Sequence, residues 1–229
     1  MAGRKPEPGA PPRPSRPWQE QALADLLQAS TETGLPVSLA VQERLQIYLR
    51  VLATWAPQMD LIGPDEAERF GTRHLADAWR AVGILRDHPA GRSLRLIDVG
   101  SGAGLPGVPL ALGLELPTAV LLEPRRRRAN FLRAVDRALE DHSFEVVEAR
   151  SENLVAQGAV FDAVVTRATF PPSRVAPECG PLVASGGLLL AWIARDVPVE
   201  GLIDPHLGAP RILSSQASPV SGLAVWRRG

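Results

Sequence analysis

The chain has 229 residues, of which 45% are hydrophobic and 22% are charged. These values are typical of a folded globular protein and exclude collagen-like, coiled-coil and wholly disordered chains. Its 25 basic side chains balance its 25 acidic ones, so no overall positive field attracts the molecule to nucleic acid or anionic lipid.

The single cysteine and the shortness of the apolar runs indicate the cellular compartment in which the protein resides. One cysteine, Cys179, cannot form an internal disulfide, and no Cys and His cluster has zinc spacing, so we expect a reducing compartment and no bound metal. Residues 1–17 lack the apolar stretch of a signal peptide, and no apolar run approaches the roughly 18 residues of a membrane span. The sequence predicts a cytoplasmic protein, which we expect to be a monomer.

The first 90 residues divide into a tail and a helical region. Residues 1–17 are rich in proline and arginine, which favours an extended, solvated tail. Three helical patterns follow, at about 18–29, from an N-cap at Ser38 to Pro57, and at about 65–86. We expect these helices to form a cap over residues 18–90.

From Leu94 onwards, short apolar strands alternate with helices. Because parallel strands need crossover connections, this alternation predicts an α/β domain over 91–229, with a mostly parallel sheet and helices on both faces. The C-terminal stretch predicts loops and one last, antiparallel strand at about 222–226. Further strands are expected at 94–100, 119–123, 144–148, 161–166 and 187–193, and helices at 108–116 and about 126–140.

A glycine-rich loop follows the first expected strand and reads Asp98-Val-Gly100-Ser-Gly102-Ala-Gly104-Leu-Pro-Gly107. Glycines at this place let the backbone approach a ligand beside a helix N-terminus, so a nucleotide-like ligand is expected. Gly102, Gly104 and Gly107 also satisfy the dinucleotide pattern G-x-G-x-x-G, which leaves a nicotinamide cofactor as an alternative.

Two acidic residues support S-adenosylmethionine, and one of them, Asp98, favours it over that alternative. Asp98 lies two residues before the first glycine, where its charge would attract the cationic amino-acid end of S-adenosylmethionine and repel a pyrophosphate. Glu123 ends the second strand about 20 residues beyond the loop, where a carboxylate can accept both ribose hydroxyls of either cofactor. We therefore predict that Asp98, Gly100, Gly102, Gly104 and Glu123 bind S-adenosylmethionine.

Four segments carry a resemblance to a known family: Arg73-His74-Leu-Ala-Asp77, LIDVGSGAGLPGVPLAL, LLEPRRRRANFL and FDAVVTRA. Through them the chain resembles, over about residues 45–193, the bacterial small-subunit (16S) ribosomal RNA guanine-N7 methyltransferases, RsmG/GidB. The resemblance implies a class I, Rossmann-like methyltransferase that moves a methyl group from S-adenosylmethionine to N7 of a guanine in 16S rRNA. It also implies cofactor contacts at Gly100, Leu105, Ser151, Glu152 and Arg167.

The resemblance and the basic residues indicate where RNA would bind. Arg73 and His74 belong to a matching segment, which implies a role toward the substrate RNA or the cofactor. Arg125 and Arg126 open a run of four arginines at a helix start, where cations are unfavourable, and this favours phosphate contact over a merely solvated helix end.

One departure from the family affects the chemistry. Family members usually carry a lysine where this chain has Ile193, and Arg195 lies two residues further on. Guanine N7 already presents a lone pair, so its methylation needs positioning and no general base. Arg150 and Arg195 are the candidates for that positioning. Two alternatives stay open: an S-adenosylmethionine-binding protein of this fold without transfer activity, and a methyltransferase acting on a smaller acceptor.

Overall fold

The computed structural model describes residues 17–63, 66–140, 143–215 and 218–229, so the predicted tail up to residue 16 lies outside the described residues. Two helices come first, α1 (Trp18–Glu32) and α2 (Leu39–Trp55). The hydroxyl of Ser38 accepts a hydrogen bond from the Val41 N–H at 3.3 Å, which confirms Ser38 as the N-cap of α2.

The third predicted helix is shorter than expected and irregular at its start. It begins as a π-helix, η2 (Phe70–Leu75), and continues as α3 (Ala76–Arg86). Gly71 lies so close to α1 that a Cβ there would be 2.4 Å from the Ala22 carbonyl oxygen. Wide helical turns of this kind concentrate at functional sites.

The sheet has seven strands in the order β3-β2-β1-β4-β5-β7-β6. The first five are parallel, and β7 is antiparallel to both β5 and β6, so the mostly parallel sheet and its antiparallel last strand are confirmed. The strands are β1 (Leu96–Val99), β2 (Thr118–Leu122), β3 (Ser143–Val147), β4 (Phe161–Arg167), β5 (Val183–Ala194), β6 (Arg211–Ser215) and β7 (Ser218–Arg227).

Three features of the C-terminal half differ from the sequence prediction. The stretch preceding β7 was expected to be loop, and the prediction missed β6, whose hydrogen bonds come from pairing with β7 and leave little local signal. Two short helices, α6 and α7, were also not predicted. The remaining helices are α4 (Gly107–Gly113), α5 (Arg126–Ala138), α6 (Ser151–Ala156) and α7 (Pro172–Cys179), with 3-10 turns η1 (Ala56–Gln58), η3 (Gly91–Ser93), η4 (Gly180–Leu182) and η5 (Val199–Leu202).

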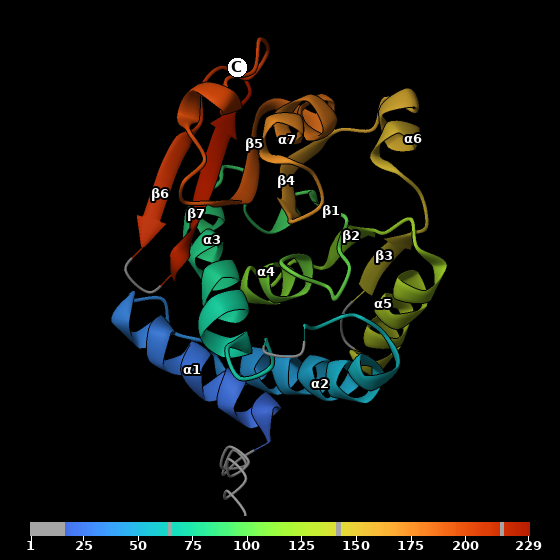
Figure 1. The fold of residues 1–229 in the computed structure, drawn as a ribbon. Coiled ribbons are helices and arrows are strands. Elements are labelled where there is room, and N and C mark those ends of the chain that lie inside the picture. The colour runs from blue at the N-terminus through green and yellow to red at the C-terminus, as the bar shows by residue number, and fades with distance from the viewer. Residues whose placement is uncertain (1–16, 64–65, 141–142, 216–217) are drawn as a thin grey trace, which may run out of the picture.

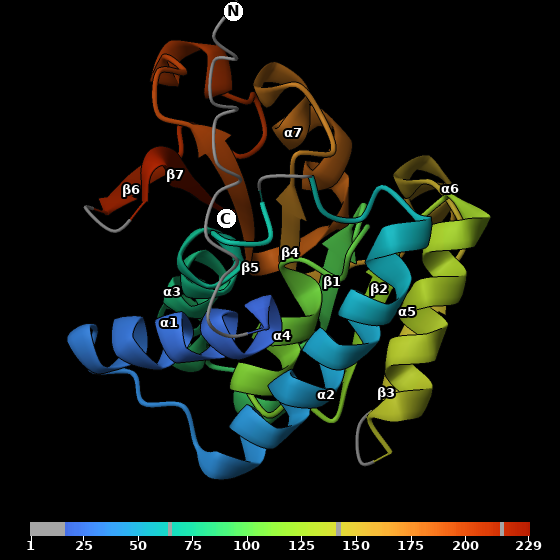
Figure 2. The same ribbon diagram turned by 60° about the horizontal axis from the view of Figure 1, so that its bottom comes forward.

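Helices cover both faces of the sheet (Figures 1 and 2). Successive strand residues point to opposite faces, so Leu96 joins the core formed with α1 to α5, and Ile97 joins the core formed with α6 and α7. Cys179 is fully buried in the second core, where burial raises the pKa of its thiol. The division into a cap over 18–90 and a domain over 91–229 stays a prediction.

The carboxyl ends of β1 to β5 meet at one edge of the sheet, where ligands of open α/β sheets bind. In the described ranges, no helix is long and apolar enough to cross a membrane.

Candidate functional site

The glycine loop leaves β1 with three glycines in left-handed conformations, which L side chains rarely adopt. Their φ angles are +77° at Gly100, +53° at Gly102 and +84° at Gly104. The N–H groups of Gly100 and Ser101 both donate to the Leu122 carbonyl, at 2.8 and 3.0 Å, and so tie the loop to the end of β2. The loop is therefore held in one shape by backbone hydrogen bonds.

Two of these glycines face different surroundings. A Cβ on Gly100 would lie 2.3 Å from Oγ1 of Thr169, a side chain that sequence reasoning did not single out and whose hydroxyl donates to the Val99 carbonyl at 3.0 Å. A Cβ on Gly102 would find nothing closer than 3.7 Å, at Nη1 of Arg128. The backbone at Gly102 is thus open to a ligand, while that at Gly100 packs against the protein.

A tyrosine from α2 holds the centre of the loop. The Tyr48 hydroxyl donates to the Ala103 carbonyl at 2.7 Å, and the side chain is fully buried. Burial, together with the charge of Asp98, raises the pKa of this phenol above its ordinary value, so Tyr48 stays a neutral donor. Tyr48 lies within the helix predicted between Ser38 and Pro57, but nothing in the sequence indicates a bond to a residue 55 positions away.

Asp98 lies at the end of β1 and is completely buried. Its Oδ2 accepts a hydrogen bond from the Gly107 N–H at 2.9 Å, while its buried Oδ1 has no partner among the described residues. Burial raises the pKa of this carboxyl to about 7, although the Gly107 N–H and the nearby Ser101 hydroxyl, which donates to the Asp98 main-chain carbonyl at 2.9 Å, oppose the shift. A buried acceptor without a donor is costly, so this oxygen suits a ligand that brings one.

Glu123 is also buried, and the protein already uses both of its oxygens. Oε2 accepts from the Gly102 N–H at 3.0 Å, and Oε1 accepts from the Arg125 N–H at 2.9 Å. Each carboxylate oxygen can accept a second hydrogen bond, so Glu123 can shape the loop and still receive a hydroxyl.

The other expected cofactor residues lie along the same edge. Leu105 is half-buried within the loop, and Ser151 is buried in the first turn of α6, with its hydroxyl donating to exposed Glu152 at 3.4 Å. Arg150 precedes α6 and is exposed. In the part of the chain that the structure describes, no group of three or more His, Cys, Asp and Glu could hold a metal ion.

The predicted run of four arginines divides into two pairs. Arg125 and Arg126 are exposed at the start of α5. Arg127 and Arg128 instead donate to the carbonyls of Gln58 and Asp60, each at 3.0 Å. The second pair therefore fixes the segment after α2 beside the glycine loop, a structural role that the sequence prediction did not foresee.

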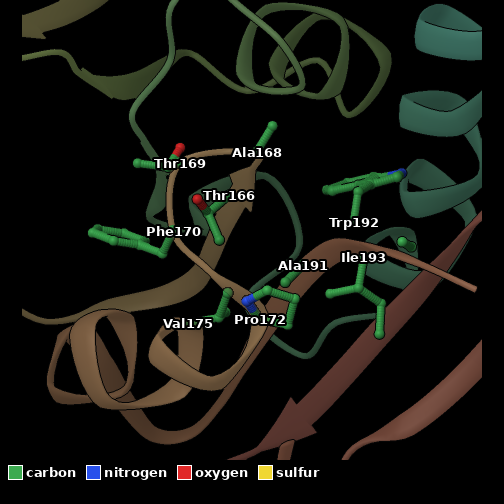
Figure 3. A pocket seen from close by; sticks show the side chains of 10 residues that line it. Thr166, Ala168, Thr169, Phe170, Pro172, Val175, Ala191, Trp192 and Ile193 are labelled. Atoms are coloured by element: carbon green, nitrogen blue, oxygen red, sulfur yellow. The ribbon is translucent and has the colours of Figure 1, made fainter. Parts of the chain in front are cut away.

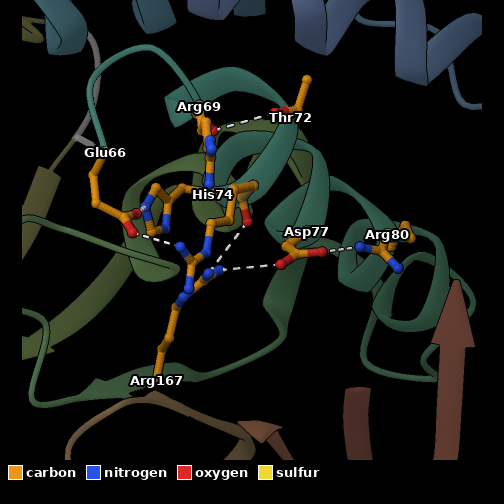
Figure 4. A network of polar contacts seen from close by, with 8 residues as sticks. Glu66, Arg69, Thr72, His74, Asp77, Arg80 and Arg167 are labelled. Carbon is orange, nitrogen blue, oxygen red and sulfur yellow. Dashed lines mark hydrogen bonds and ion pairs between the residues drawn. The ribbon is translucent and has the colours of Figure 1, made fainter. Parts of the chain in front are cut away.

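Arg167, at the end of β4, points toward the start of α3 (Figure 4). Its Nη1 lies 3.5 Å from Oδ2 of Asp77, and its Nη2 donates to the Arg73 carbonyl at 3.2 Å. Asp77 is 1% exposed and also pairs with Arg80. The structure thus joins β4 to η2 and α3 through a buried carboxylate shared by two arginines.

His74 and Arg73 share a second carboxylate, that of Glu66. Arg73 Nη1 lies 2.5 Å from Oε1 of Glu66, and His74 Nε2 contacts Oε2. Burial, assisted by the charge of Arg167, lowers the pKa of His74 to about 4 despite the contact with Glu66. Burial alone would raise the pKa of Glu66. The hydrogen bond and charge of His74 outweigh this effect, together with the charges of Arg73 and Arg167, so the pKa is lowered overall. At neutral pH His74 is uncharged and Glu66 is ionised.

A cavity of about 230 Å³ lies next to this network, between the ends of β4 and β5 and the start of α7 (Figure 3). Thr166, Ala168, Thr169, Phe170, Pro172 and Ile193 are among the residues that line it. Because Thr169 also packs against Gly100, the cavity adjoins the glycine loop. The mostly apolar lining suits a flat, uncharged group such as a nucleobase.

The structure does not bring the two proposed positioning arginines together. Arg150 follows β3 and Arg195 follows β5, and the strand order puts four strand spacings between them, about 19 Å. Arg195 follows Ala194, which lines the cavity, whereas Arg150 lies at the far side of the glycine loop. The pair therefore cannot converge on one acceptor atom.

Comparison with known proteins agrees with this architecture. The model of the family GidB, rRNA small subunit methyltransferase G, matches residues 41–197. A ribosomal RNA small subunit methyltransferase G from Mycobacterium avium is 38% identical over 148 residues, which are 64% of this chain and 58% of the relative. Another from Mycolicibacterium gilvum is 40% identical over 148 residues, 63% of this chain and 62% of the relative. The matched part is thus less than two thirds of either relative.

A solved 16S rRNA methyltransferase from T. thermophilus, in complex with AdoMet and guanosine, superposes with a TM-score of 0.52 at 17% identity. The match covers 66% of this chain and 43% of that one, and it shows the fold alone, that of the class I methyltransferases. The family match extends from α2 across the glycine loop to the end of β5 and covers well over half of the chain. The chain belongs to the rRNA small subunit methyltransferase G family.

Proposed function

We propose that this protein transfers a methyl group from S-adenosylmethionine to N7 of a guanine in 16S ribosomal RNA. One observation carries the proposal: the glycine loop (residues 100–107), which we call the cradle, is open at Gly102 and lies beside the buried carboxylate of Asp98, whose Oδ1 has no partner among the described residues. In a chain of this family, such a site suits a ligand with a cationic, hydrogen-bond-donating end. An rRNA substrate also implies a cytoplasmic protein.

The residues of the cradle fit S-adenosylmethionine, which supplies an electrophilic methyl group on a sulfonium when bound. Asp98 would accept from its ammonium group and Glu123 from its ribose hydroxyls. Gly100, Gly102, Gly104 and Leu105 would line it, and Ser151 and Glu152 would flank the adenine. We also assign a cofactor contact to Arg167, which lies at the end of β4 between the glycine loop and the cavity.

The acceptor guanine would enter the cavity at the ends of β4 and β5, next to the cradle. Its N7 carries a lone pair in the neutral base, so no residue has to remove a proton before attack. What the protein must supply is alignment of the nitrogen with the methyl group, and effects of this kind reach about 7–11 kcal/mol. Arg195 would help to position the guanine, because it lies on the cavity side of the sheet edge. Arg150 would contact the RNA from the opposite side of the glycine loop.

Exposed and half-buried basic residues around the edge would contact the RNA. Arg125 and Arg126 are exposed beside the cradle, and Arg73 is partly exposed beside the cavity. His74 would act as an uncharged hydrogen-bonding group, because its pKa of about 4 keeps it neutral. The substrate is either the naked 16S rRNA or the small ribosomal subunit.

A methyl-transfer assay with labelled S-adenosylmethionine tests this function against its two alternatives. The acceptors are small subunits from a strain that lacks this protein, purified 16S rRNA and free guanosine. We expect label in the RNA or the subunit and none in guanosine. Transfer only to a small molecule would indicate the smaller-acceptor alternative, and cofactor binding without transfer to any acceptor would indicate a binding protein.

A further inference from the structure

Four arginines from three separate parts of the chain gather beside the cavity. Arg73 belongs to η2, Arg80 to α3, Arg167 ends β4, and Arg195 follows β5. Arg167 contacts the Arg73 carbonyl and shares Asp77 with Arg80. We call these four residues the arginine cluster.

The arginine cluster carries more positive charge than its acidic partners neutralise. The described carboxylate partners of Arg73, Arg80 and Arg167 are Asp77 and Glu66, and His74 is neutral, so these three guanidinium groups face two carboxylates. Burial, together with the charge of Arg73, lowers the pKa of Arg167 to about 10. Burial likewise lowers the pKa of Arg80, as do the charges of Arg167 and Arg195. The four arginines therefore lie close enough to repel one another.

Unused donors accompany this excess of charge. The Nε atoms of Arg73 and Arg80 are buried and lack a hydrogen-bond partner among the described residues. Guanidinium groups donate in a planar fork that matches the oxygens of a phosphate, and an anion would relieve the mutual repulsion of the arginines. The site is thus complementary in charge and in hydrogen bonding to a phosphate group.

The position of the arginine cluster indicates which phosphate. Arg167 (Figure 4) directly precedes Ala168 (Figure 3). Arg195 directly follows Ala194, and both alanines line the cavity. A base in the cavity would therefore place its own backbone phosphate near the arginines.

We propose that the arginine cluster binds the phosphate of the acceptor nucleotide and thereby anchors a base extruded into the cavity. This inference rests on the proposed function for the identity of the base. The anion site itself can be tested without methyl transfer.

The test compares guanosine with guanosine 5′-monophosphate by isothermal titration calorimetry, at low ionic strength and with S-adenosylhomocysteine present. We expect the monophosphate to bind the wild-type protein at least tenfold more tightly than the nucleoside. Arg195→Gln, which changes an exposed residue, should reduce that preference to less than threefold. Arg86→Gln, at the exposed end of α3 and outside the cluster, is the matched control and should keep the full preference.

Arg80→Lys separates the planar fork from simple charge, because it keeps the cation next to Asp77 and removes the fork. We expect it to lose most of the preference while melting within a few degrees of the wild-type protein. Equal binding of guanosine and its monophosphate by the wild-type protein would refute the anion site, whatever the transfer assay gives. The anion site would also be refuted if both single variants, Arg195→Gln and Arg80→Lys, kept the full preference for the monophosphate over the nucleoside. A preserved preference without transfer to RNA would instead refute only the proposed function.

Discussion

Substitution of Gly102 separates the cost of backbone strain from the loss of a ligand site. Gly102 has a φ of +53°, and a Cβ added there meets no atom closer than 3.7 Å. An alanine would therefore clash with nothing in the protein, and its cost would be that of a left-handed L residue, about 1–2 kcal/mol. In a chain of this length, that corresponds to a fall in melting temperature of about 2–4 °C per kcal/mol.

Gly158 offers a matched control. It has a φ of +70°, nothing within 4 Å of an added Cβ, and a place at the end of α6 away from the loop. Gly158→Ala should thus cost a similar amount of stability as Gly102→Ala. Only the methyl group at position 102 would project into the cradle.

The assay is the affinity for S-adenosylmethionine, measured by calorimetry, alongside thermal unfolding of both variants. We expect Gly102→Ala to bind at least tenfold more weakly than Gly158→Ala at comparable stability. A tenfold loss corresponds to about 1.4 kcal/mol, which is modest for a methyl group that blocks close backbone approach. Equal affinity in the two variants would refute the assignment of the cradle to the cofactor.

Three further predictions concern the buried polar groups. Tyr48→Phe leaves the buried Ala103 carbonyl without its donor and should cost about 1–3 kcal/mol in urea unfolding; an unchanged midpoint would contradict a role in holding the loop. Asp98 has a raised pKa of about 7, so between about pH 4 and 7 the folded state keeps a proton that the unfolded state has lost. The free energy of unfolding contributed by this group therefore falls as pH rises through that window. Asp98→Asn should flatten the dependence of the free energy of unfolding on pH, whereas an unchanged slope would assign that dependence to other groups. Asp77→Ala leaves Arg80 and Arg167 without their shared carboxylate and should destabilise the fold by up to about 3–5 kcal/mol, less if solvent screens them; a loss below about 0.5 kcal/mol would contradict the network.

The sequence predicted those parts of the fold that local patterns specify. The alternation of strands and helices predicted the parallel sheet, and the glycines with Asp98 and Glu123 predicted a loop and two acids at the ends of β1 and β2, because strand, loop and acid spacing are all short-range signals. Strand β6 was missed because its partner supplies its hydrogen bonds, and α6 and α7 were missed because they are short and α7 contains Pro177.

The sequence could not reveal contacts between residues far apart in the chain. The helix that carries Tyr48 was predicted, but the bond from Tyr48 to Ala103 depends on how α2 packs over the loop. Thr169 looked like an ordinary loop residue until its approach to Gly100 was known. Arg80 followed no motif, and only the fold places it near Arg167 and Arg195. Such groupings arise from tertiary packing, which spacing along the sequence does not encode.

The most direct test of the central claim is to map the methyl group on the RNA itself. Small-subunit RNA that lacks the modification is incubated with the purified protein and S-adenosylmethionine, then reduced and cleaved with aniline, which cuts the chain at 7-methylguanosine. We predict one new cleavage at a single guanine of 16S rRNA, and a much weaker one when Gly102→Ala replaces the wild-type protein at a cofactor concentration that saturates only the latter. Methyl incorporation without such a cleavage, or cleavage scattered over many guanines, would contradict guanine-N7 transfer at a specific nucleotide.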